Sequence, residues 1–69
     1  MNKKQRVLRN SIKSRLELHG RSQGWLSRET KIGRAHLNKI VNAKYNPQLL
    51  TAKLIARALN CLIDDLWTL

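Results

Sequence analysis

Apolar residues recur at intervals of three and four positions along this chain, in short runs that end at turn-favouring residues. Such spacing places apolar side chains on one face of a helix, as with Leu8, Ile12 and Leu16 in the first run. No stretch alternates polar and apolar residues as a half-buried strand would, and β-branched residues are few. The sequence therefore predicts an all-α fold, a compact bundle of five short helices.

Turn-favouring residues set the expected ends of these helices. Gly20 suits the left-handed backbone that closes a helix, and Asn60 can do the same. Ser22 is a good N-cap for the second helix, whereas Pro47 deters helix in the residue before it. We expect helices at about residues 4–19, 22–30, 34–42, 49–59 and 63–67. In the fourth of these, the side chains expected to face inward are Leu50, Leu54, Ile55, Ala58 and Leu59.

The length of the chain predicts one domain, because 69 residues lie near the lower size limit for a self-sufficient core. Cys61 is the single cysteine, so no disulfide within the chain can support the fold, which is consistent with a reducing compartment. No apolar run approaches the roughly 20 residues that a membrane span needs. We expect a single domain over residues 1–69 that acts in the cytoplasm, in association with the nucleoid.

Basic residues outnumber acidic residues by 14 to 4, and the net charge of +10 is unevenly distributed. All of the excess lies in residues 1–44, whereas Lys53, Arg57, Asp64 and Asp65 cancel one another in residues 45–69. One part of the molecule is therefore a cation and the other is neutral and apolar. A charge distribution this uneven favours a polyanionic partner, and nucleic acid is the first candidate for that partner.

A helix-turn-helix is predicted over about residues 22–42, where two short helices with basic residues flank a tight turn. Leu26 and Ile32 flank the turn, and Leu37 and Ile40 would hold the second helix on the core. In this motif the first helix lies across the DNA backbone, and the second enters the major groove with its N-terminal residues against base edges.

Beyond this motif, an ordered set of residues extends over nearly the whole chain after its first few positions. The set comprises Gly20, Ser22, Gln23, Leu26, Ile32, Leu37, Ile40, Asn46, Pro47, Leu49, Ile55, Ala56, Ala58, Leu59, Asp64, Asp65 and Leu66. It resembles the Cro/CI-type helix-turn-helix proteins, the lambda-repressor-like or XRE family. The resemblance implies a five-helix fold, a dimer, and binding to a two-fold-related operator in phage, plasmid or bacterial DNA.

Some positions depart from the pattern of that family. Its turn usually holds glycine where this chain has Lys31, and a lysine in the left-handed conformation is strained by about 1 kcal/mol. The family often pairs an Arg on the first helix with a Glu at the end of the third. Leu16 and Val41 stand at those two positions here, and we expect them to contact each other instead.

The resemblance also implies which residues contact DNA. Base reading falls on the first turn and outer face of the third helix, at Arg34, Ala35, His36, Asn38 and Lys39. Phosphate contacts are predicted for Arg21, Ser22, Gln23, Arg28, Asn42, Lys44 and Tyr45. The competing interpretations are a solvated helix face for the first group and a simple helix cap at Ser22 and Gln23. Residues 1–5 are either a flexible basic arm on the DNA or a solvated tail.

Apolar residues cluster at the C-terminal end of the chain, at Leu62, Ile63, Leu66, Trp67 and Leu69. A chain this small cannot bury all of them, and an exposed apolar patch marks an interface. We interpret the cluster as the contact of a homodimer, with ordinary core closure by Ile63 and Leu66 as the alternative.

Residue types for catalysis or metal binding do not converge in the sequence. His19, His36 and Cys61 lack a metal-ligand spacing, and the four carboxylates form no pair suited to acid–base work. We therefore expect no enzyme activity, no metal, no cofactor, no small-molecule ligand and no membrane partner.

The favoured hypothesis is a sequence-specific, double-stranded-DNA-binding transcriptional regulator, a dimeric repressor of phage or mobile-element type. Its partners would be a second copy of the chain and duplex DNA with two-fold-related half-sites. One alternative is an antitoxin-like module that binds a protein partner, with DNA binding secondary. Another is a non-specific nucleic-acid or membrane-surface cation, which the ordered apolar faces disfavour.

Overall fold

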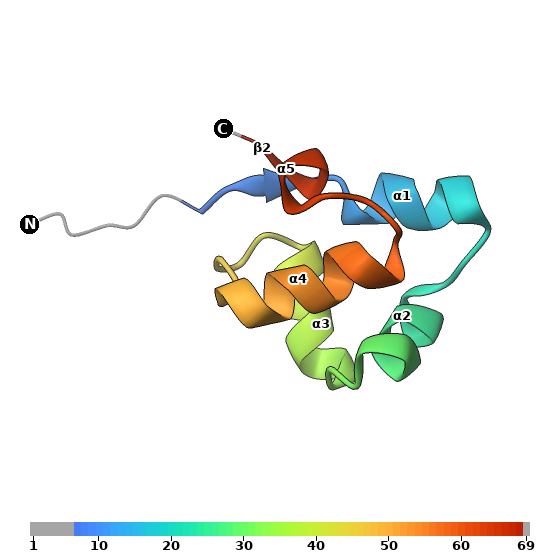
Figure 1. Ribbon diagram of the computed structural model, residues 1–69. Helices are drawn as coiled ribbons and strands as arrows, with labels where there is room; N and C mark the ends of the chain where they lie inside the picture. The colour runs from blue at the N-terminus through green and yellow to red at the C-terminus, as the bar shows by residue number, and fades with distance from the viewer. Residues whose placement is uncertain (1–6, 69) are drawn as a thin grey trace, which may run out of the picture.

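The computed structural model describes residues 7–68, so the predicted arm at residues 1–5 and the side chain of Leu69 lie outside the described residues. In chain order the elements are β1 (Arg9–Asn10), α1 (Ile12–His19), α2 (Gln23–Thr30), α3 (Arg34–Val41), α4 (Leu49–Ala58), α5 (Ile63–Leu66) and β2 (Trp67–Thr68). The five helices confirm the predicted fold class. Figure 1 shows α4 between the α2–α3 pair and α5, and α4 contacts both α2 and α5.

The first helix begins at Ile12, whereas the described residues 7–11, which were expected to belong to it, are not helical. Arg9 and Asn10 pair with Thr68 and Trp67 in a two-stranded antiparallel ladder, so the expectation of no strand was wrong for these four residues. Asn10 Oδ1 accepts a 3.1 Å hydrogen bond from the Ile12 N–H, a local bond that starts α1 at this point. The ladder joins the two ends of the described chain side by side.

The core draws its side chains from all five helices. The largest fully buried residues are Ile12, Leu26, Leu37, Ile40, Ile55, Leu59 and Leu66, each at most 1% exposed. Leu16 and Val41 belong to the same buried cluster, as the replacement of an ion pair by apolar residues requires. Their direct contact stays a prediction.

Helix α4 is rotated relative to the sequence-based expectation. Leu50 and Leu54 were expected to face inward but are 69% and 37% exposed, whereas Ala52, Ile55 and Ala56 are buried. Both sets have helical spacing, so periodicity alone does not choose between them. The stripe with the two small alanines faces the core, and three leucines, Leu49, Leu50 and Leu54, are left on the outside.

Several predicted helix ends are confirmed. Gly20 and Asn60 adopt φ angles of +65° and +56°, and Ala43 adopts +56° after α3. These residues follow α1, α4 and α3. In each case the left-handed residue and the one after it donate their backbone N–H groups to carbonyl oxygens of the last turn, a recurrent way to close a helix. At the start of α2, Ser22 Oγ accepts a 3.0 Å hydrogen bond from the Trp25 N–H.

Candidate nucleic-acid interface

Two buried hydroxyl groups fix the turn between α2 and α3. Ser27 Oγ donates a 2.5 Å hydrogen bond to the carbonyl oxygen of Ile32. Thr30 Oγ1 donates to the Leu26 carbonyl at 2.8 Å and accepts from the Ile32 N–H at 3.3 Å. Both polar groups of the Ile32 backbone are thus satisfied by side chains of α2, so the start of α3 is held in a defined direction. The role of Ser27 was not predicted from the sequence; a small polar residue directly after the inward-facing Leu26 was the available signal.

Lys31 ends α2 in the left-handed conformation, with φ of 64° and ψ of 20°. A lysine therefore adopts the left-handed conformation at a position where the family usually has glycine, which costs about 1 kcal/mol. The Lys31 N–H donates a 2.9 Å hydrogen bond to the Ser27 carbonyl, which closes the helix. The turn therefore keeps a left-handed residue at this point, although a lysine is unfavourable there.

Helix α3 presents its polar side to solvent. Leu37, Ile40 and Val41 are buried and hold the helix on the core. The residues predicted to read bases all lie on the exposed part of the helix: Arg34, Ala35, His36, Asn38 and Lys39. The structure thus places the whole predicted group where a duplex could reach it, and its reading of bases stays a prediction.

Two arginines approach the same glycine in the first turn of α2. A methyl group built on Gly24 would lie 3.6 Å from Nη1 of Arg28 and 3.6 Å from Cζ of Arg34. Gly24 is buried under these side chains, although both arginines are exposed. Within residues 7–68 no carboxylate forms an ion pair with either guanidinium. Two unpaired positive charges close together favour an anion between them, such as a backbone phosphate.

Other predicted phosphate contacts surround this pair. Ser22 and Gln23 open α2 next to Gly24, Ser22 being exposed and Gln23 half-buried. The Arg21 guanidinium lies 4.8 Å from the centre of the Trp25 ring, a cation–π contact that orients the charge along the same edge. Trp25 itself is partly buried and packs on the core.

A second basic cluster lies at the other end of α3. The rings of His36 and Tyr45 stack with their centres 5.8 Å apart and their planes at 29°. Together with Lys39 and Lys44 they line an open hollow on the surface. Asn42 Nδ2 donates a 3.0 Å hydrogen bond to Asn38 Oδ1 at the same end of α3. The fold thereby brings residues of both predicted groups into one place.

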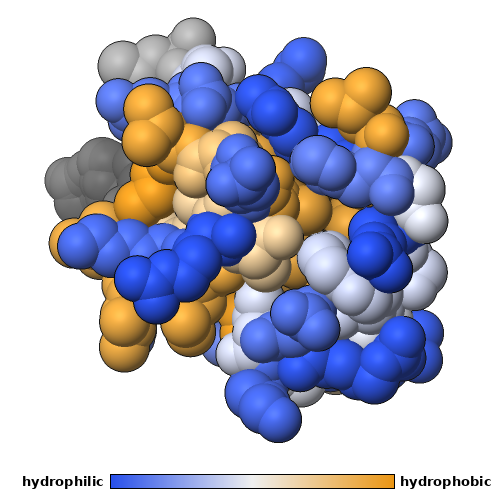
Figure 2. All heavy atoms as spheres, turned by 45° about the vertical axis from the view of Figure 1, so that its right-hand side comes forward, coloured by the Kyte–Doolittle hydropathy of each residue, from blue (hydrophilic) through white to orange (hydrophobic). Residues whose placement is uncertain are grey.

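The surface is divided between apolar and hydrophilic regions. Figure 2 shows apolar residues gathered mainly on the left of the view and strongly hydrophilic residues along the lower right.

Among the described residues, no group of three or more His, Cys, Asp or Glu could hold a metal ion. No described helix is long and apolar enough to cross a membrane.

The predicted dimer contact is smaller than expected. Leu66 and Trp67 are only 1% and 9% exposed, because they close the core of their own chain, so these two are corrected to core residues. Trp67 pairs with Asn10 in the ladder, and the Leu66 carbonyl accepts a 2.9 Å hydrogen bond from the Ser11 N–H. Leu62 is 71% exposed and Ile63 is half-buried, so these two remain on the surface.

A family model described as helix-turn-helix, of the XRE or Cro/CI type, matches residues 12–66. The chain belongs to this family. No curated protein matches the chain. Proteins of this helix-turn-helix family bind DNA and are generally not enzymes, so the match supports a DNA-binding, transcription-regulatory role. The matched segment includes α2, the turn and α3, and with them every predicted DNA-contacting residue in 21–45.

Proposed function

We propose that this helix-turn-helix protein is a sequence-specific transcriptional regulator that binds duplex DNA with α3 in the major groove. The observation that carries the proposal is the exposure of Arg34, Ala35, His36, Asn38 and Lys39 on a helix whose other side is buried. A helix of this width fits the major groove, where each base pair presents a distinct pattern of donors and acceptors.

The side chains of α3 suit base edges. Lys39 and Arg34 can donate to the O6 and N7 atoms of guanine, and the methyl group of Ala35 can meet a thymine methyl group. His36 and Asn38 can donate or accept beside them. Because Arg34 and Arg28 both lie beside Gly24, the Arg34 guanidinium can contact either a base or an adjacent phosphate.

The two basic clusters would position α3 on the duplex. At its N-terminal end the phosphate contacts come from Arg21, Ser22, Gln23 and Arg28, and at its C-terminal end from Asn42, Lys44 and Tyr45. Contacts to phosphate fix register and orientation, whereas contacts to base edges carry sequence information. Several such contacts in each subunit would make the affinity fall steeply with salt concentration.

We further propose that the protein acts as a homodimeric repressor on two-fold-related half-sites, as the family resemblance suggests for phage and mobile-element regulators. It would act in the cytoplasm on nucleoid DNA and block polymerase by occupying its operator. The match to the family over residues 12–66 supports the DNA-binding part of this proposal.

Selection of bound duplexes from a random pool tests the proposed function. We expect enrichment of one motif with two similar half-sites, related by a two-fold axis and separated by about one helical turn of DNA. The same selection with the double variant Arg34→Ala, Lys39→Ala is the control, because any motif that it also enriches comes from the method and not from α3. Recovery of a random pool with the wild-type protein would refute sequence-specific binding.

A further inference from the structure

The loop between α3 and α4 returns an aromatic side chain to α3. Ala43 follows the helix with a φ of +56°, and its N–H donates a 3.0 Å hydrogen bond to the Ile40 carbonyl oxygen. The next N–H, that of Lys44, donates to the Lys39 carbonyl oxygen at 2.9 Å. The chain therefore reverses at the end of α3, and the ring of Tyr45 lies against that helix.

The backbone after Tyr45 is also held in place. Asn46 Oδ1 accepts a 2.8 Å hydrogen bond from the Leu8 N–H, which ties the loop to the segment before β1. Pro47 comes next, and its ring fixes the φ angle at that position. Because the backbone is anchored on both sides of Tyr45, the fold sets the position from which this side chain extends.

Tyr45 stacks on His36, one of the residues predicted to read bases. The ring centres are 5.8 Å apart and the ring planes are inclined by 29°, within the range that aromatic pairs favour. His36 is exposed on α3, and an exposed imidazole without a neighbour samples several orientations, because its second torsion angle has only broad preferences. The stack therefore favours one orientation of the His36 ring before any DNA is bound.

The orientation of His36 matters for base reading. A neutral imidazole has one donor nitrogen and one acceptor nitrogen, so the base edge that it prefers depends on which nitrogen it presents. Lys39 lies three residues after His36 and thus on the same side of α3, and it lines the same hollow as the two rings. The stacked pair accordingly belongs to the face of α3 that we place in the major groove.

We propose that Tyr45 is a positioning residue: its ring holds His36 in the orientation in which the imidazole reads a base pair. Tyr45 thereby influences sequence preference without touching a base. This inference deepens the proposed function and rests on it, because only a helix in the major groove can use an oriented imidazole. It adds to the phosphate contact predicted for Tyr45, which needs only the hydroxyl group.

Two substitutions separate the ring of Tyr45 from its hydroxyl group. Tyr45→Phe keeps the ring and removes the hydroxyl, whereas Tyr45→Leu removes both and keeps an apolar side chain. If the ring positions His36, Tyr45→Leu changes the base preference and Tyr45→Phe retains it. If both variants lose affinity for every duplex by one common factor, the hydroxyl on phosphate is the whole contribution and the positioning role is refuted.

Proton NMR of the free protein tests the stack without DNA. An aromatic ring shifts the resonances of protons that lie over its face, so the imidazole C–H signals of His36 should be displaced in the wild-type protein and in Tyr45→Phe. In Tyr45→Leu they should move toward those of an unstacked histidine. His19, the other histidine, lies at the end of α1 and provides the reference. His36 signals that Tyr45→Leu leaves unchanged would contradict the stack and, with it, the proposal.

Affinities for four duplexes test the role in base reading. One is a duplex selected by the wild-type protein, and the others carry the three remaining base pairs at the position where His36→Ala loses its preference. The preference is the ratio of the affinity for the first duplex to the mean affinity for the others. Tyr45→Leu should lower this ratio about three- to tenfold, as expected from the strength of an aromatic pair, while Tyr45→Phe should keep it. Partial unfolding would lower all four affinities equally and leave the ratio unchanged.

A double variant tests whether Tyr45 acts through His36. In the His36→Ala protein there is no imidazole to orient, so the addition of Tyr45→Leu should leave the ratio at the His36→Ala value. A further fall in the ratio would mean that Tyr45 reads a base by itself, which would overturn the positioning role.

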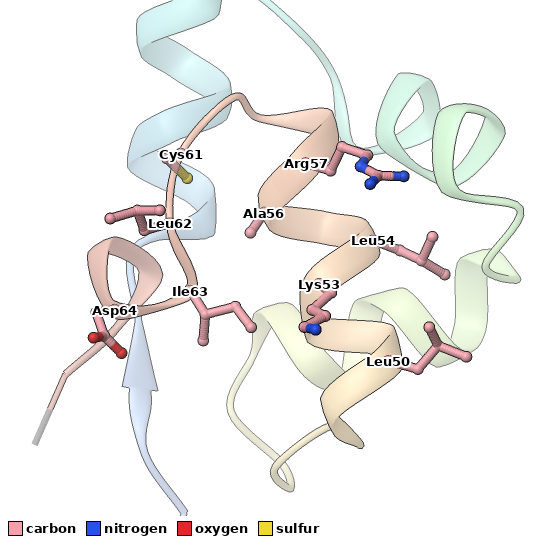
Figure 3. Close-up of a pocket in the computed structure, with 9 residues that line it drawn as sticks. All are labelled: Leu50, Lys53, Leu54, Ala56, Arg57, Cys61, Leu62, Ile63 and Asp64. Carbon is pink, nitrogen blue, oxygen red and sulfur yellow. The ribbon is translucent and has the colours of Figure 1, made fainter.

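Two lysines provide controls for charge. Lys44 lines the same hollow, and Lys44→Gln should weaken binding to all four duplexes by one factor, because a phosphate contact carries no sequence information. Lys53 lines a separate groove between α4 and the start of α5 (Figure 3), and Lys53→Gln should leave the ratio unchanged. A fall of the ratio in Lys44→Gln equal to that in Tyr45→Leu would assign the effect to charge in the hollow and refute the role of the ring.

The outcomes separate this inference from the proposed function. If the wild-type protein prefers no duplex, the proposed function fails, and the positioning role fails with it. If the wild-type protein is selective but Tyr45→Leu keeps the full ratio, or His36→Ala changes no base preference, only the positioning role fails.

Discussion

Ser27 and Ile32 are joined across the turn between α2 and α3 by a 2.5 Å hydrogen bond from the Ser27 hydroxyl to the Ile32 carbonyl oxygen. Ser27 is only 9% exposed and Ile32 only 8%, so water cannot easily replace this bond. The orientation of the helix that faces DNA thus depends on one hydroxyl group in the helix before it.

We expect Ser27→Ala to lower the free energy of unfolding by about 1–3 kcal/mol, because the Ile32 carbonyl would be left buried without its partner. Urea denaturation followed by circular dichroism measures the change. Ser14→Ala is the control, because Ser14 is exposed on α1 and its loss should matter by less than about 0.5 kcal/mol. Equal stabilities of the two variants would show that the turn does not need the hydroxyl.

Lys31→Gly should stabilise the protein by about 1 kcal/mol, because glycine adopts a φ of +64° without the steric cost of a side chain. Lys13→Gly removes the same charge from the first turn of α1, where the backbone is right-handed, and should destabilise by less than about 1 kcal/mol. The comparison of their urea midpoints therefore isolates the backbone effect. A destabilising Lys31→Gly substitution would mean that the lysine side chain contributes more than its conformation costs.

Local signals were sufficient to predict much of this fold. Ser22, Gly20 and Asn60 act within a few residues of themselves, and each of these helix ends is confirmed. The outward face of α3 was also predictable, because Leu37 and Ile40 leave one inward orientation for that helix.

Features that depend on distant contacts were not predictable in this way. The run containing Leu8 and Ile12 has helical spacing, but Asn10 pairs with Trp67 at the other end of the chain and keeps that segment extended. In α4 two apolar stripes compete, and packing against other helices decides which is buried. The approach of Arg34 to Gly24 depends on the shape of the whole turn, which spacing does not encode.

Arg28→Gln should weaken binding to specific and random duplexes by the same factor, because a phosphate contact carries no sequence information. The slope of log affinity against log salt concentration should become shallower by about one. Lys53→Gln removes a charge on α4 that is not among the predicted DNA contacts, and it should leave the slope unchanged. A larger loss on the specific duplex alone would assign Arg28 to base reading.

Burial raises the pKa of the Cys61 thiol, with the positive charge of Arg15 opposing this shift and the carboxylate of Asp65 adding to it. Because the thiolate is the reactive form, iodoacetamide should reach its half-maximal rate at a higher pH with native protein than with urea-unfolded protein. Because the pKa of the thiol is higher in the folded protein than in the unfolded chain, the folded state holds the proton more tightly. This adds to stability below the pKa of the unfolded thiol, and the contribution is lost as the pH rises through the pKa of the folded thiol.

The control for this titration is Cys61→Ser, which should lack that alkaline loss of stability in urea denaturation at successive pH values. Equal midpoints of alkylation in the native and unfolded states would contradict the raised pKa.

The most direct test of sequence reading by α3 is the ratio of affinities of Lys39→Ala for a selected duplex and for a scrambled duplex of equal length, at one salt concentration. Lys39 is exposed on the face of α3 that we place in the major groove. We predict that the ratio falls about tenfold from its wild-type value, which corresponds to about 1.4 kcal/mol, while Lys13→Ala leaves it unchanged. A Lys39→Ala ratio equal to that of the wild-type protein would contradict base reading by this side chain, and the same result for Arg34→Ala would contradict it for the helix.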